Sequence, residues 1–453
     1  MEQTDHLALP VPRRWRDAAL DQVGDALATF VDTCVHPVVV VPLFLASMTD
    51  SSVTVGVALA FILAATALAY PVGAALERRA AYQQGGLIGA FGLRALALYA
   101  LAGVAMFAGP GHAPPLALAV FLFVAIGLLG GFARPLRLEL ASGTSAEAPL
   151  GGLRARWALA GGVAAVLGAL AARPLLVVGS PLLPASYARL LILAGLILTL
   201  ATTVAVLLRP AAPAPPRGFL ADARAFPGLV FDNLAYGRFL FFRVLYAIGA
   251  IADPFYILYA TRELGGSGRA AGAYLLALAV TRAVAVLVWR SLRPRWGNQL
   301  VLQLSAFVRV LAPIVALTLP PLLGAAALRD RLPGDNAVSL VAFGLVFVAY
   351  GAAGAGLDLA APALQAAITA PRERLDAAVV TNLALALGAL SIIVGGVIVD
   401  RFGYAILFIV ALIAGLAALL ACGLLEEPGL VVMRAPPGER APLRRRRRPV
   451  RGE

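Results

Sequence analysis

The sequence predicts an all-α integral membrane protein whose twelve transmembrane helices form two pseudo-symmetric six-helix bundles around a central cavity. Three observations support this fold class. The chain of 453 residues is 61% hydrophobic and only 13% charged, whereas soluble domains carry about 25% charged residues. Apolar runs of membrane-spanning length recur along the chain, and only helices satisfy their own backbone over such lengths in lipid. Finally, the pattern of the first half returns in the second at a fixed spacing.

Twelve apolar segments each have about the 20 residues that a bilayer core requires. They lie near residues 26–46, 53–76, 86–108, 115–133, 157–178, 188–208, 239–260, 270–289, 299–320, 338–360, 376–399 and 405–425. With a cytoplasmic N-terminus, the inner loops hold 15 arginines and the outer loops 5, which is the usual bias of membrane proteins. We therefore expect a multi-pass protein of a bacterial inner (cytoplasmic) membrane, with both termini in the cytoplasm.

The segments define five regions. Residues 1–25 lack the apolar core and cleavage site of a secretory signal, and we expect a cytoplasmic lead-in. Residues 26–208 and 239–427 form the two six-helix bundles. The stretch 209–238 begins rich in Pro and Ala, which is typical of a linker, and its second part has room for a short surface helix. Residues 428–453 are a basic cytoplasmic tail, expected to be solvated close to anionic lipid.

Composition and motifs exclude several function classes. The formal net charge is +13, but the arginines sit in short segments between apolar runs, so we do not expect nucleic-acid binding. Cys34 and Cys422 lie inside apolar runs and indicate neither a disulfide framework nor a metal site. The phosphate-cradling pattern G-x-x-x-x-G-K-[ST] does not occur, and no nucleophile with a base stands out. We expect no enzyme and no cofactor, and an ion gradient rather than ATP as the energy source.

The internal repeat has one spacing. "YARLL" at 187 returns as "YAILF" at 404, and the hairpin "GAALERRA" at 73 falls on "RSLRPRWG" at 290. At the same offset His36-Pro37 falls on Asp253-Pro254, since 253 − 36 = 217. One spacing that recurs over six segments indicates duplication of a six-helix unit. Repeats that flank a site at the bilayer midplane are typical of secondary transporters.

The hairpin between the last two segments carries a family resemblance. "GGVIVDRFGY", 395–404, is similar to the G-x-x-x-D-R-x-G hairpin signature of the major facilitator superfamily, and the chain resembles that family over residues 20–427. The copy at 73–80 has Glu77 in place of Asp and Ala80 in place of Gly, and the copy at 290–297 has Pro294 at the acidic position. The resemblance implies gating roles for Gly73, Glu77, Arg78, Arg295, Gly297, Asp400, Arg401 and Gly403.

The hairpin chemistry also follows from the residues themselves. Glycine suits a tight turn at the membrane surface, and acidic and basic side chains suit opposite ends of helix dipoles. Such charges can clasp the two halves in one state and release them in another. The alternative is that these arginines only set the topology.

Ionisable residues within a membrane span are costly and are functional candidates. Asp32 and His36 lie on one stripe of the first segment, and Asp253 lies near the middle of the seventh. In the resembling family these two helices line the central cavity, which implies that His36 and Asp253 face each other across the pseudo-two-fold axis. Pro37 and Pro254 are expected to kink their helices beside these groups.

Alternatives stay open for each of these side chains. Asp253 either carries a proton, binds a cationic or polar substrate, or is a structural partner of Arg282 or of the kinked backbone. His36 serves coupling or substrate binding, or is a packing residue. Arg282 is favoured as a cavity charge, whereas Arg94 and Arg309 are expected to snorkel toward the cytoplasmic surface. Asp358 and Arg243 are expected at the interface. The candidate substrate or proton-coupling residues are Asp32, His36, Tyr246, Asp253, Tyr256, Arg282 and Asn382.

The resulting hypothesis is a secondary active transporter that moves a small organic solute by alternating access, coupled to a proton or another ion. The expected partners are this solute, the ion and the lipid bilayer, with the chain as a monomer. The alternative is a facilitator-like sensor or accessory membrane protein that transports nothing. Retained gating hairpins and titratable residues inside the spans favour the transporter.

Overall fold

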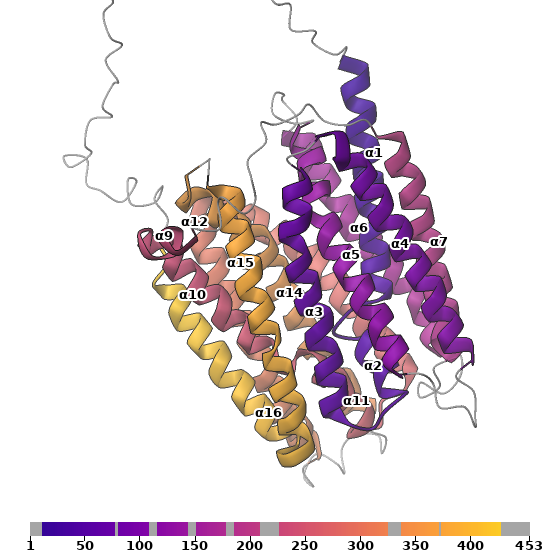
Figure 1. Cartoon of the computed structure of the whole chain (residues 1–453). Helices are drawn as coiled ribbons and strands as arrows, with labels where there is room; N and C mark the ends of the chain where they lie inside the picture. Colours follow the sequence, from indigo (N-terminus) through magenta and orange to yellow (C-terminus); the bar gives the residue numbers. More distant parts are fainter. Residues whose placement is uncertain are drawn as a thin grey trace, which may run out of the picture.

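The computed structural model describes residues 11–77, 80–107, 116–143, 151–177, 185–208, 226–324, 337–370 and 373–426. The expected tail, 428–453, the linker up to residue 225 and the hairpin residue Arg78 lie outside these residues. The described chain is helical throughout apart from turns and short connections, and no strand occurs in it. Figure 1 shows the two halves side by side, with the first half in indigo to purple-magenta and the second from rose through orange to yellow.

The described residues of the first half form seven helices. They are α1 (Val11–Cys34), α2 (Val40–Ala46), α3 (Ser52–Glu77), α4 (Ala80–Phe107), α5 (Leu116–Gly143), α6 (Gly151–Val177) and α7 (Ala185–Leu207). The second half contains α9 (Phe226–Phe231), α10 (Leu234–Ile248), the 3₁₀ turn η2 (Gly249–Ala252), α11 (Asp253–Arg262), α12 (Gly268–Gly324), α14 (Ala337–Ile368), α15 (Arg374–Ala389) and α16 (Ser391–Gly423). The short surface helix expected in the linker is α9, and α10 begins inside the range expected for that linker.

Two of these long helices are hairpins. α12 turns at Gly297, with φ 80° and ψ 175°, and α16 turns at Gly403, with φ 82° and ψ 174°. A positive φ favours glycine, because a side chain there would strain the backbone. These turns divide α12 and α16 into two segments each. Three other segments combine neighbouring elements: α1 with α2, α10 with α11, and α15 with the start of α16. Counted in this way, the described residues contain the twelve predicted membrane segments.

The first and seventh segments are interrupted at the positions that the repeat superimposes. α1 ends at Cys34 and α2 begins at Val40, and the carbonyl of His36 accepts the N–H groups of Val39, Val40 and Val41 at 3.3, 2.9 and 3.2 Å. In the second half η2 precedes α11, which has Pro254 in its first turn. Proline has no N–H and cannot continue a helix interior. The expected kink is therefore a complete break in the first segment and a 3₁₀ turn in the seventh.

The N-terminal helix is longer than predicted. α1 begins at Val11, so helix occupies much of the lead-in expected at residues 1–25. Pro12 fits at the first turn of a helix, where its missing N–H would have no partner. In Figure 1 the start of α1 projects beyond its neighbours. We call this end of the molecule the α1 end, and the opposite end, where α2 and α11 lie, the α2 end.

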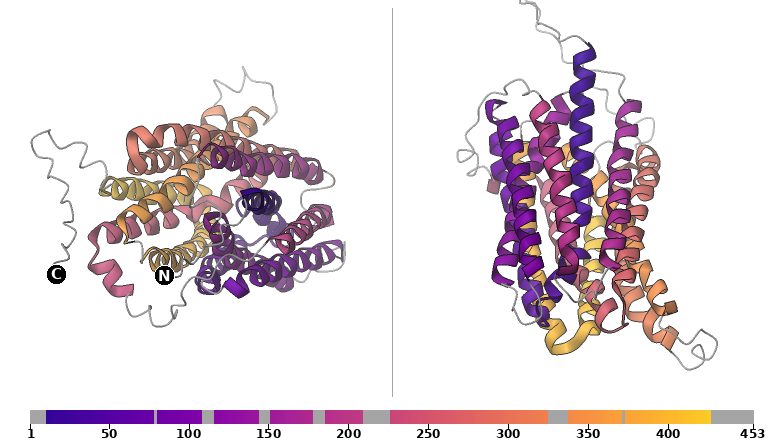
Figure 2. Two further views of the ribbon diagram at one scale, coloured as in Figure 1. Left: turned by 90° about the horizontal axis from the view of Figure 1, so that it is seen from above. Right: turned by 90° about the vertical axis from the view of Figure 1, so that its right-hand side faces the viewer.

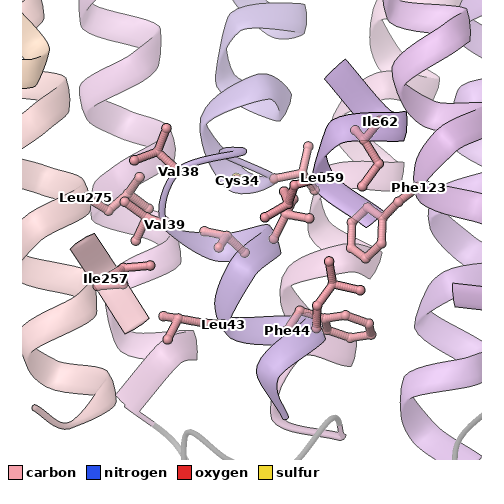
Figure 3. Close-up of a cluster of buried hydrophobic side chains, with 14 of the residues drawn as sticks. Cys34, Val38, Val39, Leu43, Phe44, Leu59, Ile62, Phe123, Ile257 and Leu275 are labelled. Atoms are coloured by element: carbon pink, nitrogen blue, oxygen red, sulfur yellow. The ribbon is translucent and has the colours of Figure 1, made fainter. Parts of the chain in front are cut away.

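The two halves share an apolar core at the α2 end. One buried cluster combines residues of both halves, among them Val38, Val39 and Leu43 with Ile257 and Leu275, and Figure 3 shows these side chains around α2. A second buried cluster, around Tyr236 and Trp289, contains second-half residues alone. Figure 2 gives two further views of this arrangement, one of them from the α1 end. The apolar contact between the halves therefore lies mainly toward the α2 end.

Two of the glycines show how closely the helices pack. A Cβ at Gly131 on α5 would lie 1.9 Å from the carbonyl oxygen of Thr66 on α3. A Cβ at Gly396 on α16 would lie 2.5 Å from the carbonyl oxygen of Ser52, so the second half touches the start of α3 backbone to backbone. Small residues at such points permit tight packing in membrane proteins.

Candidate functional site

A cavity of about 520 Å³ lies mainly within the first half and reaches the second. Its lining extends from Asp25 near the α1 end to His36 and Pro37 at the break, and to Phe123 beyond it. Only α12 and α14 contribute second-half residues, including Arg282. Ligand sites for small molecules have volumes of roughly 300–1,000 Å³, so the cavity has room for a small organic molecule.

Three ion pairs line this cavity. Arg94 donates to Asp32 at 2.6 Å, and Arg137 donates to Asp25 at 2.9 Å. The third pair joins Arg282 to Asp358 within the second half. The exposed fractions of the three carboxylate side chains are 46% for Asp32, 49% for Asp25 and 44% for Asp358. Each carboxylate is therefore in reach of both its arginine and solvent.

His36 lies at the break between α1 and α2 and lines the cavity. Its Nδ1 accepts the backbone N–H of Val38 at 3.2 Å. In a neutral imidazole one nitrogen accepts and the other donates, so Nε2 carries the proton. The break therefore holds the ring in place and gives it a donor. Asp32 lies one turn earlier on α1, as the predicted stripe requires.

Asp253 has a different environment. It accepts a hydrogen bond from Arg309 at 2.6 Å, and the exposed fractions of the two side chains are only 9% and 12%. The guanidinium of Arg309 lies 5.0 Å from the ring centroids of both Tyr246 and Tyr350. Asp253 and Tyr246 are absent from the cavity lining. The structure thus does not place Asp253 opposite His36 in the cavity.

The structure also corrects the expectations for four charged residues. Arg282 pairs with Asp358 rather than with Asp253. Arg94 and Arg309 do not snorkel to the surface but reach inward to carboxylates. Asp358 is a cavity residue rather than an interfacial one.

Two further candidates lie away from the cavity lining. The ring of Tyr256 is stacked on that of Phe408, with centroids 5.1 Å apart. Asn382 donates to the carbonyl of Ala378 on its own helix at 2.8 Å. Both side chains therefore have local partners within the second half.

At the α2 end a carboxylate of the second half caps a helix of the first. Asp400 accepts the N–H groups of Ser52 at 3.0 Å and Val53 at 3.2 Å and the hydroxyl of Ser51 at 3.3 Å. These N–H groups belong to the first turn of α3 and have no partner within the helix. Arg262 of α11 adds bonds to the hydroxyl of Ser52 at 3.2 Å and the carbonyl of Thr49 at 3.4 Å. We call these residues the α2-end clasp.

The other predicted gating residues have varied surroundings. Gly297 and Gly403 form the hairpin turns, and Arg295 and Arg401 beside them are exposed. Gly73 packs against α5, since a Cβ there would lie 2.2 Å from the carbonyl oxygen of Phe132. Glu77 is the last residue of α3, and its side chain lies outside the described part of the chain, as does Arg78.

Comparison with known proteins identifies the fold of the chain. No protein-family model and no curated protein sequence matches the chain. Solved structures do match: a nucleoside transporter, NupG, has a TM-score of 0.65 at 12% identity, covering 91% of this chain and 100% of that one. The D-xylose-proton symporter has a TM-score of 0.63 at 13% identity, covering 90% and 97%. An auto-inhibited POT family peptide transporter has a TM-score of 0.65 at 12% identity, covering 93% and 97%.

The chain has the major facilitator fold. The predicted fold class, twelve membrane helices in two related bundles, is confirmed by these structures. The names of these three solved proteins describe transporters. The apolar helices and the shared fold make it a multi-pass membrane protein. The cavity described above is lined mainly by the first half, and α12 and α14 of the second half complete its wall.

Proposed function

We propose that the protein is a secondary active transporter that moves a small organic solute by alternating access, coupled to protons. One observation carries this proposal. A solvent-accessible, charged cavity extends from the α1 end to the break in the first segment, while the α2 end is sealed by contacts between the halves. A cavity open to one side only is what alternating access requires of each end state. The similarity to solved transporters supports the same conclusion.

The arginine bias supports an orientation. The inner loops predicted from the sequence hold 15 arginines and the predicted outer loops 5, and cytoplasmic loops carry the excess. The described state is then open to the cytoplasm and closed to the outside by the α2-end clasp. Opening to the outside requires that Asp400 leave the first turn of α3 and that Arg262 leave Thr49 and Ser52.

We assign proton coupling to Asp32 with Arg94 rather than to Asp253. A coupling carboxylate must exchange protons with water, and the Asp32 side chain is 46% exposed, whereas that of Asp253 is 9% exposed. Protonation of Asp32 would weaken its bond to Arg94 and free that guanidinium toward the cavity. His36, one turn away with an Nε2 donor, is the second candidate for the proton path.

The test follows the two ends of the molecule by distances between spin labels. Cys34 and Cys422 are replaced by Ala, and exposed sites of opposite halves are labelled. The pair Asp50→Cys with Glu263→Cys reports on the α2 end, and the pair Ala19→Cys with Phe231→Cys reports on the α1 end.

Removing the clasp with Asp400→Ala should add a longer distance at the α2 end and a shorter one at the α1 end. Arg401→Gln is the matched control, since it removes the neighbouring exposed charge, which makes no bond across the halves in the described residues. If the α2-end distances lengthen without shortening at the α1 end, alternating access is refuted. If neither distance changes, the clasp does not hold the halves, and a non-transporting sensor becomes the better reading.

A further inference from the structure

Arg94 lies over a glycine of α5 where it enters the cavity. It belongs to α4, and its guanidinium donates to Asp32 of α1 at 2.6 Å. Both side chains and Gly130 of α5 line the cavity. A Cβ added at Gly130 would lie 3.4 Å from the guanidinium carbon, 3.5 Å from Nη2 and 3.6 Å from Nε of Arg94. The guanidinium therefore occupies the space that a larger side chain at Gly130 would fill.

Packing between helices does not explain this glycine. A Cβ at Gly127 would lie 2.7 Å from the carbonyl oxygen of Ile62 on α3. A Cβ at Gly131 would lie 1.9 Å from the carbonyl oxygen of Thr66 on the same helix. Gly130 precedes Gly131 by one residue, or about 100° around the helix, and the three nearest neighbours of its Cβ position are all atoms of Arg94. The contact with α3 thus explains two glycines of α5, and the guanidinium explains the third.

The corresponding helix of the second half carries a large side chain at its arginine. α14 contains the tenth membrane segment and α5 the fourth, so the two helices are equivalent in the repeat. The guanidinium of Arg309 lies 5.0 Å from the ring centroid of Tyr350 on α14. Its partner Asp253 is 9% exposed, whereas Asp32 is 46% exposed. A tyrosine therefore lies against the arginine of the sealed pair, and a glycine against the arginine of the pair that solvent reaches.

Building on the proposed proton coupling through Asp32 and Arg94, we propose that Gly130 is a positioning residue of this pair, because it leaves the space in which the guanidinium reaches the carboxylate and moves away from it. The bond to Asp32 is the only hydrogen bond of this guanidinium among the described residues, and its Nε is buried without a partner. Its place therefore depends on that bond and on the space over the glycine.

The size of the side chain at this position decides whether the pair forms. A methyl group would make an ordinary contact with the guanidinium at 3.4–3.6 Å. A γ carbon extends one bond further and would displace it. Valine carries two γ carbons, and in a helix its χ1 is largely restricted to one rotamer, so it cannot turn both of them aside. We therefore expect Gly130→Ala to keep the ion pair and Gly130→Val to break it.

The spin labels at the α1 end test this inference through their response to pH. Gly130→Val should shift the midpoint of the response by the same amount as Arg94→Met, since both variants remove the ion pair. Gly130→Ala should keep the midpoint of the wild type. The matched control is Gly89→Val on α4, which makes the same exchange at a helix position with open space around it. It should also keep the wild-type midpoint.

A double variant separates the guanidinium from the rest of the site. Methionine is unbranched and flexible, so Arg94→Met should make room for the γ carbons at residue 130. Gly130→Val combined with Arg94→Met should therefore melt no lower than Arg94→Met alone, which is the non-additivity expected of residues in contact. If Gly130→Val does not fold by itself, the double variant should restore folding. Failure of both to fold would mean that the valine meets something other than Arg94, and would overturn the inference.

The remaining outcomes distinguish this inference from the proposed function. A wild-type midpoint in Gly130→Val, an equal shift in Gly89→Val, or additive losses in the double variant overturn the role of Gly130 and leave Asp32 and Arg94 as the coupling pair. If the distances in the wild type do not respond to pH at all, proton coupling fails and this inference fails with it.

Discussion

The buried pair of Asp253 and Arg309 gives the sharpest test of the structural reasoning. Arg309→Met removes the guanidinium and leaves Asp253, whose side chain is 9% exposed, without a counter-charge. Breaking a buried ion pair by removing one partner costs about 3–5 kcal/mol. The two tyrosine rings at 5.0 Å from the guanidinium would also lose their contact with it. We expect the free energy of unfolding to fall by about 4 kcal/mol, or roughly a thousandfold in the folding equilibrium.

The control is the corresponding pair of the first half. Arg94→Met leaves Asp32, but its side chain is 46% exposed and can regain water from the cavity. Its loss should be about 1 kcal/mol, as for solvent-accessible pairs. Both variants are compared by denaturation of the purified protein in mixed micelles, with helix content as the signal.

A double variant separates the charge from the packing. Asp253→Leu with Arg309→Met replaces the pair by apolar side chains, which is often neutral or stabilising for a buried pair. It should recover most of the stability that Arg309→Met loses. Equal losses for Arg309→Met and Arg94→Met, or no recovery in the double variant, would refute the assignment of Asp253 to a sealed structural pair.

Three further outcomes follow from the structure. Asp32→Asn should remove the response of the spin-label distances at the α1 end to a change of pH, and Asp253→Asn should keep it; the reverse result would return coupling to Asp253. Gly131→Ala should lower the free energy of unfolding by about 1–3 kcal/mol through overpacking, whereas Gly103→Ala, with open space around it, should not; equal effects would contradict the close contact of α3 and α5. Burial, followed by a neighbouring carboxylate of α1, raises the pKa of Asp21, which precedes the first membrane segment, from 3.8 to about 7. The folded protein therefore disfavours the charged form of Asp21. The stability that the neutral form retains below pH 3.8 is lost as pH rises toward 7. Asp21→Asn should thus have a higher melting temperature than the wild type at about pH 8 and the same melting temperature at about pH 3.5.

The fold could be predicted from the sequence because the lipid bilayer imposes a simple constraint on the chain. A helix that spans the bilayer needs a long apolar run, and such runs are visible without any tertiary knowledge. The internal repeat also predicted the two helix breaks, because His36-Pro37 and Asp253-Pro254 occupy equivalent positions in the two halves. The hairpin turns at Gly297 and Gly403 also follow from sequence, because only a glycine suits the positive φ of such a turn.

The ion-pair partners of the charged residues could not be predicted from the sequence. Hydropathy locates a charge along a helix but does not say which way that face points. Arg94 and Arg309 were therefore assigned to snorkelling, although each reaches inward to a carboxylate. The fourth apolar segment ends near residue 133, so the sequence predicts a loop at Arg134 and Arg137, whereas α5 continues to Gly143. One signal could have found them: their spacing of about one helical turn, which places both side chains on one face if the helix continues.

The two halves differ in the surroundings of an aspartate–arginine pair that each of them contains. Each has an acid on its interrupted segment and an arginine two segments later, Asp32 with Arg94 and Asp253 with Arg309. In the second half two tyrosine rings lie against the arginine of the pair, and a low dielectric holds the charged pair together. In the first half the break opens into the cavity, so water and a proton can reach the pair and weaken it. A transporter needs one element that responds to its ligands and one that stays fixed while the other moves. We therefore assign the response to the first half, and expect changes in the second to alter stability before they alter coupling.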